Sequence, residues 1–229
     1  MLLLILAAVL PAAYLMWKVY RSDRLEREPP RMLLGLVLLG MISTALAGTA
    51  EQLGDRILSY VLDDSSVARN ALFFFLVVGP AEEGFKYAVL RWRTWRHPEF
   101  DCQYDGVVYA VFVSLGFALW ENIGYVTMYG LGAAVARALT AVPGHASFGV
   151  FMGACYGLAR QEENRGAHEQ SVFWRIMSVL LPTVIHGCYD YIAIMRSEEN
   201  GETFLIFVAL VFLSAFALMR RLSRRDRFI

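Results

Sequence analysis

The sequence has few cysteines and no excess of charge. Its three cysteines, Cys102, Cys155 and Cys188, are an odd number without CxxC spacing, which disfavours a disulfide framework and a cysteine zinc site. Lysine plus arginine and aspartate plus glutamate number 21 each, so the formal net charge is zero. The overall charge therefore gives no sign of a nucleic-acid partner, and we expect none. Internal repeats and low-complexity segments are also absent.

Hydrophobic residues are abundant, at 57% of the chain, and the mean hydropathy is +0.46. Soluble domains are usually about 45–50% apolar. The excess lies in long runs, which predict an all-α, polytopic membrane protein with about seven spans of about 20 residues each. We expect one domain over residues 1–229. The predicted spans cover residues 1–20, 32–50, 70–90, 106–128, 134–158, 173–195 and 203–219.

The first apolar run has no basic segment before it and no Ala-x-Ala cleavage site. We therefore expect a retained span rather than a signal peptide. The loops after the first, third and fifth spans and the C-terminal tail are rich in arginine, whereas the alternate loops are mostly acidic. Because basic loops stay in the cytoplasm, this alternation predicts an outside N-terminus and a cytoplasmic C-terminus.

Ionisable and amide side chains interrupt the third to sixth predicted spans. A charged side chain near the bilayer centre costs about 2.5–3.5 kcal/mol on the insertion scale, so each needs a protected partner. The interrupting residues are Glu82, Glu83, Lys86, Glu121, Asn122, His145, His186 and Asp190. By counting, each lies near the middle of its span. Four helices can bury such residues at similar depth only by facing one another, which predicts a polar cavity within a catalytic core of about residues 70–195.

Helical spacing supports this convergence. Glu82 and Glu83 precede Lys86 by four and three residues, so a glutamate can pair with the lysine as its counter-ion. His186 and Asp190 are also four residues apart, and Asp190 can orient the imidazole or act as a ligand itself. Small residues spaced by four over residues 106–122 and 141–157 favour close approach of those two helices.

Two chemical interpretations fit these groups. In one, His145 and His186, with Glu121, hold a zinc ion with an open position for water, and a glutamate acts as general base. In the other, no metal takes part: the glutamate activates water unaided, and histidine and Asn122 stabilise an oxyanion. The sequence contains no HExxH helix and no GxSxG motif, which disfavours a zincin-type or serine-elbow site.

A different function class is a non-proteolytic transporter or proton relay, or a catalytically silent membrane binding protein, because glutamate, histidine and aspartate in spans also build ion pathways. Transporters often have broken helices in both halves of the chain. Here the polar residues cluster in the third to sixth spans only, which favours a single reaction chamber.

Four short motifs contain these residues. They are EExxK at Glu82–Lys86, FxxxEN at Phe117–Asn122, HxxxG at His145–Gly149 and HxxxD at His186–Asp190. In this order on successive spans they resemble the PrsW family of intramembrane proteases, which is distantly similar to the CAAX prenyl endopeptidases and bacteriocin-processing proteins. Residues 20–29 also look like the family's N-terminal portion, so the resemblance covers most of the chain.

The resemblance implies a multi-pass metalloprotease of the bacterial cytoplasmic membrane that takes part in regulated intramembrane proteolysis. Its substrate would be a single-span membrane protein in the bilayer, as with the anti-sigma factors cleaved by the best-described members. By motif, the catalytic or ligand residues would be Glu82, Glu83, His145 and His186. The supporting residues would be Lys86, Glu121, Asn122 and Asp190. Which of Glu82 and Glu83 is the base stays open, as does the use of zinc.

Overall fold

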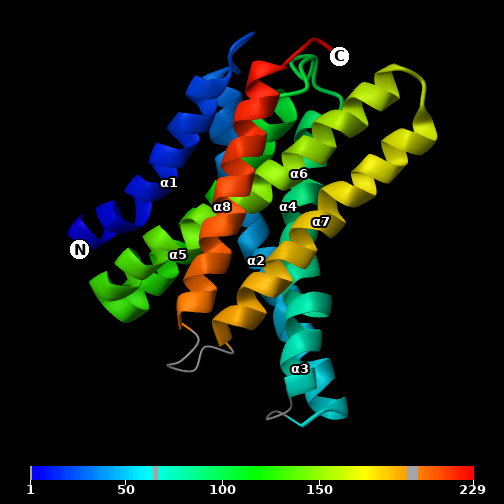
Figure 1. Cartoon of the computed structure of the whole chain (residues 1–229). Helices are drawn as coiled ribbons and strands as arrows, with labels where there is room; N and C mark the ends of the chain where they lie inside the picture. Colours follow the sequence, from blue (N-terminus) through cyan, green and yellow to red (C-terminus); the bar gives the residue numbers. More distant parts are fainter. Residues whose placement is uncertain (1, 64–66, 195–200) are drawn as a thin grey trace.

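The computed structural model describes residues 2–63, 67–194 and 201–229, and these parts are almost entirely helical (Figure 1). The elements are α1 (Leu2–Ser22), α2 (Pro30–Val61), α3 (Val67–Leu72), the π-helix η1 (Phe73–Val78), α4 (Gly79–Thr94), α5 (Asp105–Leu139), α6 (Ala141–Asn164), α7 (His168–Ile194) and α8 (Gly201–Arg224). The all-α prediction is confirmed. The loop charges Asp64, Arg196, Glu198 and Glu199, on which the orientation prediction also depends, lie outside the described residues.

Four helical stretches are long and apolar enough to cross a membrane. They are Pro30–Val61, Asp105–Asn164, His168–Ile194 and Gly201–Arg224. The second of these contains both α5 and α6, and α1 and the η1–α4 segment coincide with two further predicted spans. The chain is therefore a membrane protein with several apolar helices, while the count of seven crossings and the orientation stay predictions.

The fifth predicted span starts too early. Residues 134–139 belong to the end of α5, and α6 begins only at Ala141. The boundary is Thr140, which has a non-helical φ of −125° and ψ of −68°. Gly130 interrupts α5 earlier, with φ 76° and ψ −161°, a conformation that side-chain-bearing residues rarely adopt. The helix changes direction there, so the segment after Gly130 does not continue along the axis of the first part of α5.

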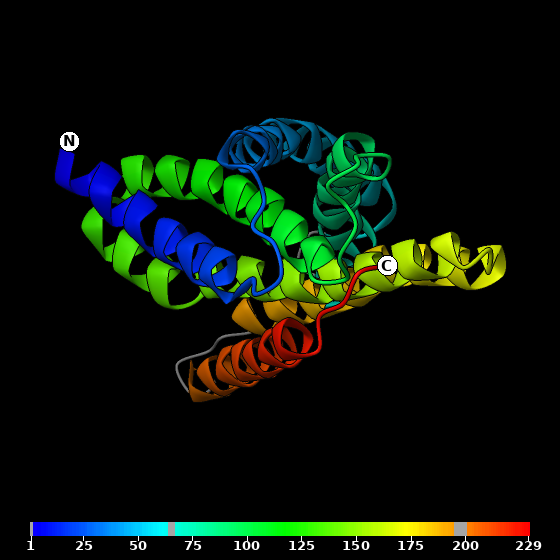
Figure 2. The same ribbon diagram turned by 90° about the horizontal axis from the view of Figure 1, so that it is seen from above.

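The helices α5 and α6 form the centre of the structure, with α2 and α4 on one side and α8 on the other (Figures 1 and 2). Nearly every residue of α5 from Asp105 to Ala118 is buried. A Cβ atom on Gly106 would lie 2.7 Å from the carbonyl oxygen of Gly153, and one on Gly153 would overlap the carbonyl oxygen of Gly106. The predicted close approach of these two helices is confirmed.

The EExxK helix α4 follows directly on the π-helix η1. Single π-helical turns are rare and often occur at functional sites. Gly79 starts α4 against α7, because a Cβ atom there would lie 3.0 Å from the carbonyl oxygen of Thr183. Pro80 occupies the first turn of α4, and because it has no backbone N–H, one helical hydrogen bond is missing where η1 joins α4. This local geometry brings the first turns of α4 against the middle of α7.

Candidate active site

Lys86 lies at the centre of a buried polar cluster. Its Nζ donates to Glu82 Oε2 at 2.9 Å and to Glu83 Oε1 at 2.8 Å, and lies 3.2 Å from Nδ1 of His145. The ammonium group also lies 4.0 Å from the centroid of the Phe117 ring, a cation–π contact. Lys86 is 0% exposed, and a charge at such depth needs neutralising partners. Both glutamates of the EExxK motif supply them from the same helix.

His186 on α7 joins the cluster through the same Glu83 oxygen that contacts Lys86. Its Nδ1 lies 2.9 Å from Glu83 Oε1, and its Nε2 lies 3.8 Å from Glu82 Oε2 and 3.4 Å from Asp190 Oδ2. The ring stacks on Phe148 with centroids 4.6 Å apart. The imidazole is therefore held on one face by an aromatic ring and at both nitrogens by carboxylates.

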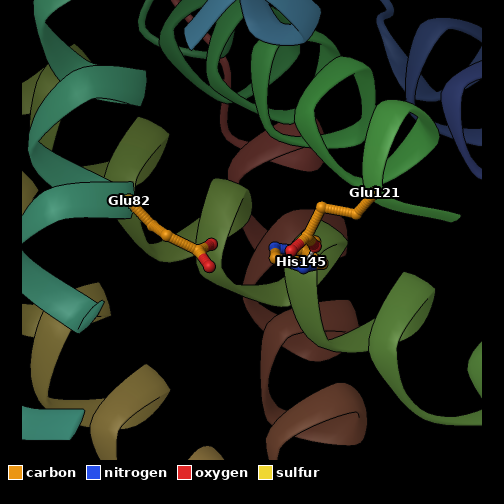
Figure 3. Close-up of side chains that lie close together, drawn as sticks. All are labelled: Glu82, Glu121 and His145. Atoms are coloured by element: carbon orange, nitrogen blue, oxygen red, sulfur yellow. Dashed lines mark hydrogen bonds and ion pairs between the residues drawn. The ribbon is translucent and has the colours of Figure 1, made fainter. Parts of the chain in front are cut away.

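His145 on α6 lies on the opposite side of Lys86. Its Nε2 is 2.9 Å from Glu121 Oε2, and its backbone carbonyl accepts a hydrogen bond from Ser114 Oγ at 2.7 Å. Figure 3 shows Glu82 pointing from α4 toward the paired side chains of Glu121 and His145. The rings of His145 and His186 have centroids 5.5 Å apart at 85°. Residues from α4, α5, α6 and α7 thus converge, as the sequence analysis expects.

Arg137 also belongs to this site, although it lies outside the four motifs. Its Nη2 donates to Glu121 Oε2 at 3.2 Å, and its Nε donates to Asn122 Oδ1 at 2.9 Å. Along a straight helix, residues 15 or 16 positions apart would be separated by roughly 24 Å. The break at Gly130 is what folds the end of α5 back onto Glu121. The sequence signal for this contact is a single arginine, Arg137, that follows Gly130 and Gly132 in an otherwise apolar stretch.

Asn122 is buried, and its side chain connects helices rather than facing the histidines and glutamates of the cluster. Its Nδ2 donates to the carbonyl oxygen of Ala8 in α1 at 2.8 Å, and its Oδ1 accepts from Arg137. These bonds connect α1 to both parts of α5. The geometry gives no support to an oxyanion role for this amide.

Besides Asp101, Cys102 and Asp105 near the start of α5, two sets of side chains, both in this cluster, can hold a metal ion, each with its ligand atoms within 4.8 Å of one another. One is Glu82, Glu121 and His145, and the other is Glu82, Glu83 and His186. Imidazole with carboxylates suits zinc. The buried Oε2 of Glu83 has no hydrogen-bond partner among the described residues, an unsatisfied acceptor that a cation would satisfy. The donor set therefore fits a divalent metal ion. The predicted ligands His145 and His186 fall in different sets, and both sets contain Glu82.

Glu121 and Asp190 are the most accessible carboxylates of the cluster, with side chains 19% and 22% exposed. Glu82, Glu83, His145 and His186 are each at most 5% exposed. The two more exposed acids each contact one of the histidines.

The fold and this cluster define a multi-pass membrane protein with a buried glutamate–histidine site. The family model described as "PrsW family intramembrane metalloprotease" matches residues 28–219, and the chain belongs to this family. It is 33% identical over 227 residues to "Protease PrsW" of Bacillus subtilis (strain 168), covering 99% of this chain and 97% of that protein.

Two further relatives carry the same name. "Protease PrsW" of Geobacillus kaustophilus (strain HTA426) is 35% identical over 208 residues, covering 90% of this chain and 87% of that protein. "Protease PrsW" of Halalkalibacterium halodurans is 32% identical over 225 residues, covering 98% of this chain and 99% of that protein. No solved structure matches the chain. The resemblance inferred from the four motifs is confirmed.

Proposed function

We propose that this protein is an intramembrane protease that hydrolyses a peptide bond in or near the transmembrane segment of a membrane protein, with Glu82 as the general base. The observation that carries the proposal is the position of Glu82, which belongs to both candidate ligand sets and faces His145 and Glu121 (Figure 3). Family membership and the relatives named as proteases support peptidase activity. They do not favour the transporter alternative.

Glu82 is better suited than Glu83 to activate water. Its Oε2 is bound to Lys86, whereas its Oε1 makes no hydrogen bond with any described residue. Oε1 can accept a proton from water while the water oxygen forms a bond to the scissile carbonyl carbon. The same group then donates that proton to the nitrogen as the carbon–nitrogen bond breaks, which leaves a carboxylic acid and an amine and restores the Glu82 carboxylate.

Glu83 has a positioning role in this proposal. Its Oε1 lies 2.8 Å from Lys86 Nζ and 2.9 Å from His186 Nδ1, so one carboxylate oxygen contacts both the ammonium group and the imidazole. Lys86 balances the negative charge of the glutamate pair. The ring nitrogens of His145 contact Lys86 and Glu121, and those of His186 contact Glu83 and Asp190. In this proposal one imidazole exchanges such a contact for the oxyanion that forms on the carbonyl oxygen.

A bound divalent ion such as zinc would be held beside Glu82 by either Glu83 and His186 or Glu121 and His145, and would polarise the carbonyl and acidify water. We propose a single-span membrane protein of the bacterial cytoplasmic membrane as substrate, with a membrane-anchored anti-sigma factor as the first candidate from the family resemblance.

N-terminal proteomics of membranes tests the proposal. Cells would express the wild type, Glu82→Gln or the control Glu26→Gln, which removes an exposed acid outside the cluster, at matched levels and with and without envelope stress. We expect new termini in single-span proteins with the wild type and the control but not with Glu82→Gln. Identical termini in all strains under every condition would overturn the proposal.

A further inference from the structure

A groove on the face away from the active site runs between α1, α6 and α8. It has a volume of about 340 Å³ and an almost wholly apolar lining. The lining includes Tyr14, Leu15, Val150, Phe212, Ala215 and Phe216. The lining residues from α6 are Ala146, Ser147 and Val150, which lie roughly 100°, 200° and 140° around the helix from His145. The groove is therefore separate from the catalytic cluster, behind the same helix.

A basic pocket adjoins this groove at one end. Its volume is about 270 Å³, and the two share Lys18, Phe216 and Met219. No carboxylate lines this pocket, and five cations do. They are Lys18, Arg21, Arg24, Arg220 and Arg224. Within the described parts of the chain, none of these five forms an ion pair, unlike Arg69, Arg137 and Arg165. Concentrated, unpaired positive charge of this kind attracts an anion.

The cations are presented by two helix ends that are tied together. Ser223 Oγ on α8 donates to the carbonyl oxygen of Ser22 at the end of α1. The C-terminal ends of both helices lie close together at the top of Figure 1. Lys18 is half-buried where the apolar groove meets the basic pocket. The pocket is thus held in place by the fold rather than assembled from free side chains.

We propose that this composite pocket binds one anionic phospholipid, with its phosphate among the five cations and its acyl chains along the apolar groove. Arginine matches phosphate geometry through its planar set of donors, and basic pockets between membrane helices bind anionic head groups. A substrate helix fits less well, because single-span proteins usually carry lysine and arginine at their cytoplasmic end. These five cations would repel such an end.

Native mass spectrometry of the detergent-purified protein tests this proposal. Dioleoyl phosphatidylglycerol, dioleoyl phosphatidylcholine and soluble glycerol phosphate would each be titrated. We expect one retained phosphatidylglycerol per chain and weaker retention of the other two, because phosphatidylcholine has no net charge and glycerol phosphate has no acyl chains. Equal retention of phosphatidylcholine would overturn the proposal. So would glycerol phosphate binding as tightly as the lipid, since the groove would then contribute nothing.

A matched pair of triple variants separates the pocket from general surface charge. Lys18→Gln/Arg220→Gln/Arg224→Gln removes three lining cations, and Arg31→Gln/Arg221→Gln/Arg225→Gln removes three exposed cations that line neither pocket. We expect the first to weaken phosphatidylglycerol binding about 100-fold and the second less than about 3-fold. Equal losses would contradict a specific site.

Single variants keep the test valid if a triple variant fails to fold. Arg220 and Arg221 are neighbours near the end of α8, but only Arg220 lines the pocket. We expect Arg220→Gln to weaken phosphatidylglycerol binding about 5-fold and Arg221→Gln to leave it within about 2-fold. An equal effect of both would overturn the proposal.

Discussion

His186 Nδ1 lies 2.9 Å from Glu83 Oε1, although the two residues are 103 positions apart in the sequence. The same oxygen accepts a hydrogen bond from Lys86. Glu83 therefore connects α4 to α7 and fixes the separation of the two helices at the cluster. Glu82, one position earlier, has a less constrained carboxylate that faces α5 and α6 (Figure 3).

We expect Glu82→Gln and Glu83→Gln to fail for different reasons. Glu82→Gln should lower the rate of peptide cleavage at least about 100-fold, because it removes a proton acceptor. It should cost less stability than Glu83→Gln, because Glu82 pairs with Lys86 alone whereas Glu83 also contacts His186. Glu83→Gln should lower both activity and stability, because it weakens a link between helices. Cleavage of a reporter substrate and thermal denaturation in detergent would be measured together. Unchanged stability in Glu83→Gln would contradict its positioning role.

Lys86→Met tests the charge balance of the cluster. Removal of one partner from a buried ion pair typically costs about 3–5 kcal/mol, because an uncompensated charge stays behind. We expect a lower denaturation temperature in Lys86→Met and partial recovery in Lys86→Met/Glu83→Gln, which also removes a negative charge. Thermal denaturation of both variants checks this. The loss of stability caused by Glu83→Gln would be compared in the wild type and in Lys86→Met. If the loss is the same in both, Lys86 and Glu83 do not interact.

Arg137→Gln should disturb Glu121 and therefore His145. The arginine donates to Glu121 and Asn122, and Glu121 Oε2 lies 2.9 Å from His145 Nε2. We expect roughly a 10-fold loss of cleavage rate. The matched control is Arg165→Gln, which breaks an exposed ion pair with Glu162 and should have almost no effect, since exposed pairs contribute about 0–1 kcal/mol. Equal activity of both variants would contradict the link through Glu121.

Much of the site follows from helical periodicity. The spacing of Glu82, Glu83 and Lys86 on one helix predicts their mutual contacts, and these contacts are present. The return of Arg137 to Glu121 was not predictable, because it depends on the positive φ of Gly130, which no periodic pattern encodes. The bond from Asn122 to Ala8 was equally hidden, since every residue has a backbone carbonyl that can serve as acceptor.

The contact between α5 and α6 makes Gly153→Ala strongly destabilising. Its Cβ atom would overlap the carbonyl oxygen of Gly106, and backbone atoms cannot rotate away as a side chain can. The control is Gly35→Ala in α2, where a Cβ atom would meet nothing within 4 Å. We expect that control to be neutral or about 0.5–1 kcal/mol more stable, because alanine is a better helix former. Denaturation temperatures that fall equally in both would contradict this packing argument.

Two buried acids in the loop between α1 and α2, Asp23 and Glu28, should make the stability of the fold depend on pH. Burial and the nearby Asp226 raise the pKa of Asp23 from 3.8 to about 6, although Arg27 opposes the shift. Burial, with Asp23 and Glu99, raises the pKa of Glu28 from 4.5 to about 7, while the nearby Tyr109 hydroxyl opposes the shift. The backbone amides of Leu25 and Glu26 lie near Asp23 and stabilise its ionised form only in part.

A carboxyl group whose pKa is higher in the folded state binds more protons there than in the unfolded state. Stability then falls as pH rises between the two pKa values, here from about pH 4 to about pH 7. We expect the denaturation temperature to be roughly 5 °C lower at pH 8 than at pH 5. Asp23→Asn/Glu28→Gln should reduce this difference, and Glu26→Gln, an exposed acid in the same loop, should keep it. An undiminished pH dependence in the double variant would place its origin in other groups, because neither substituted side chain can titrate.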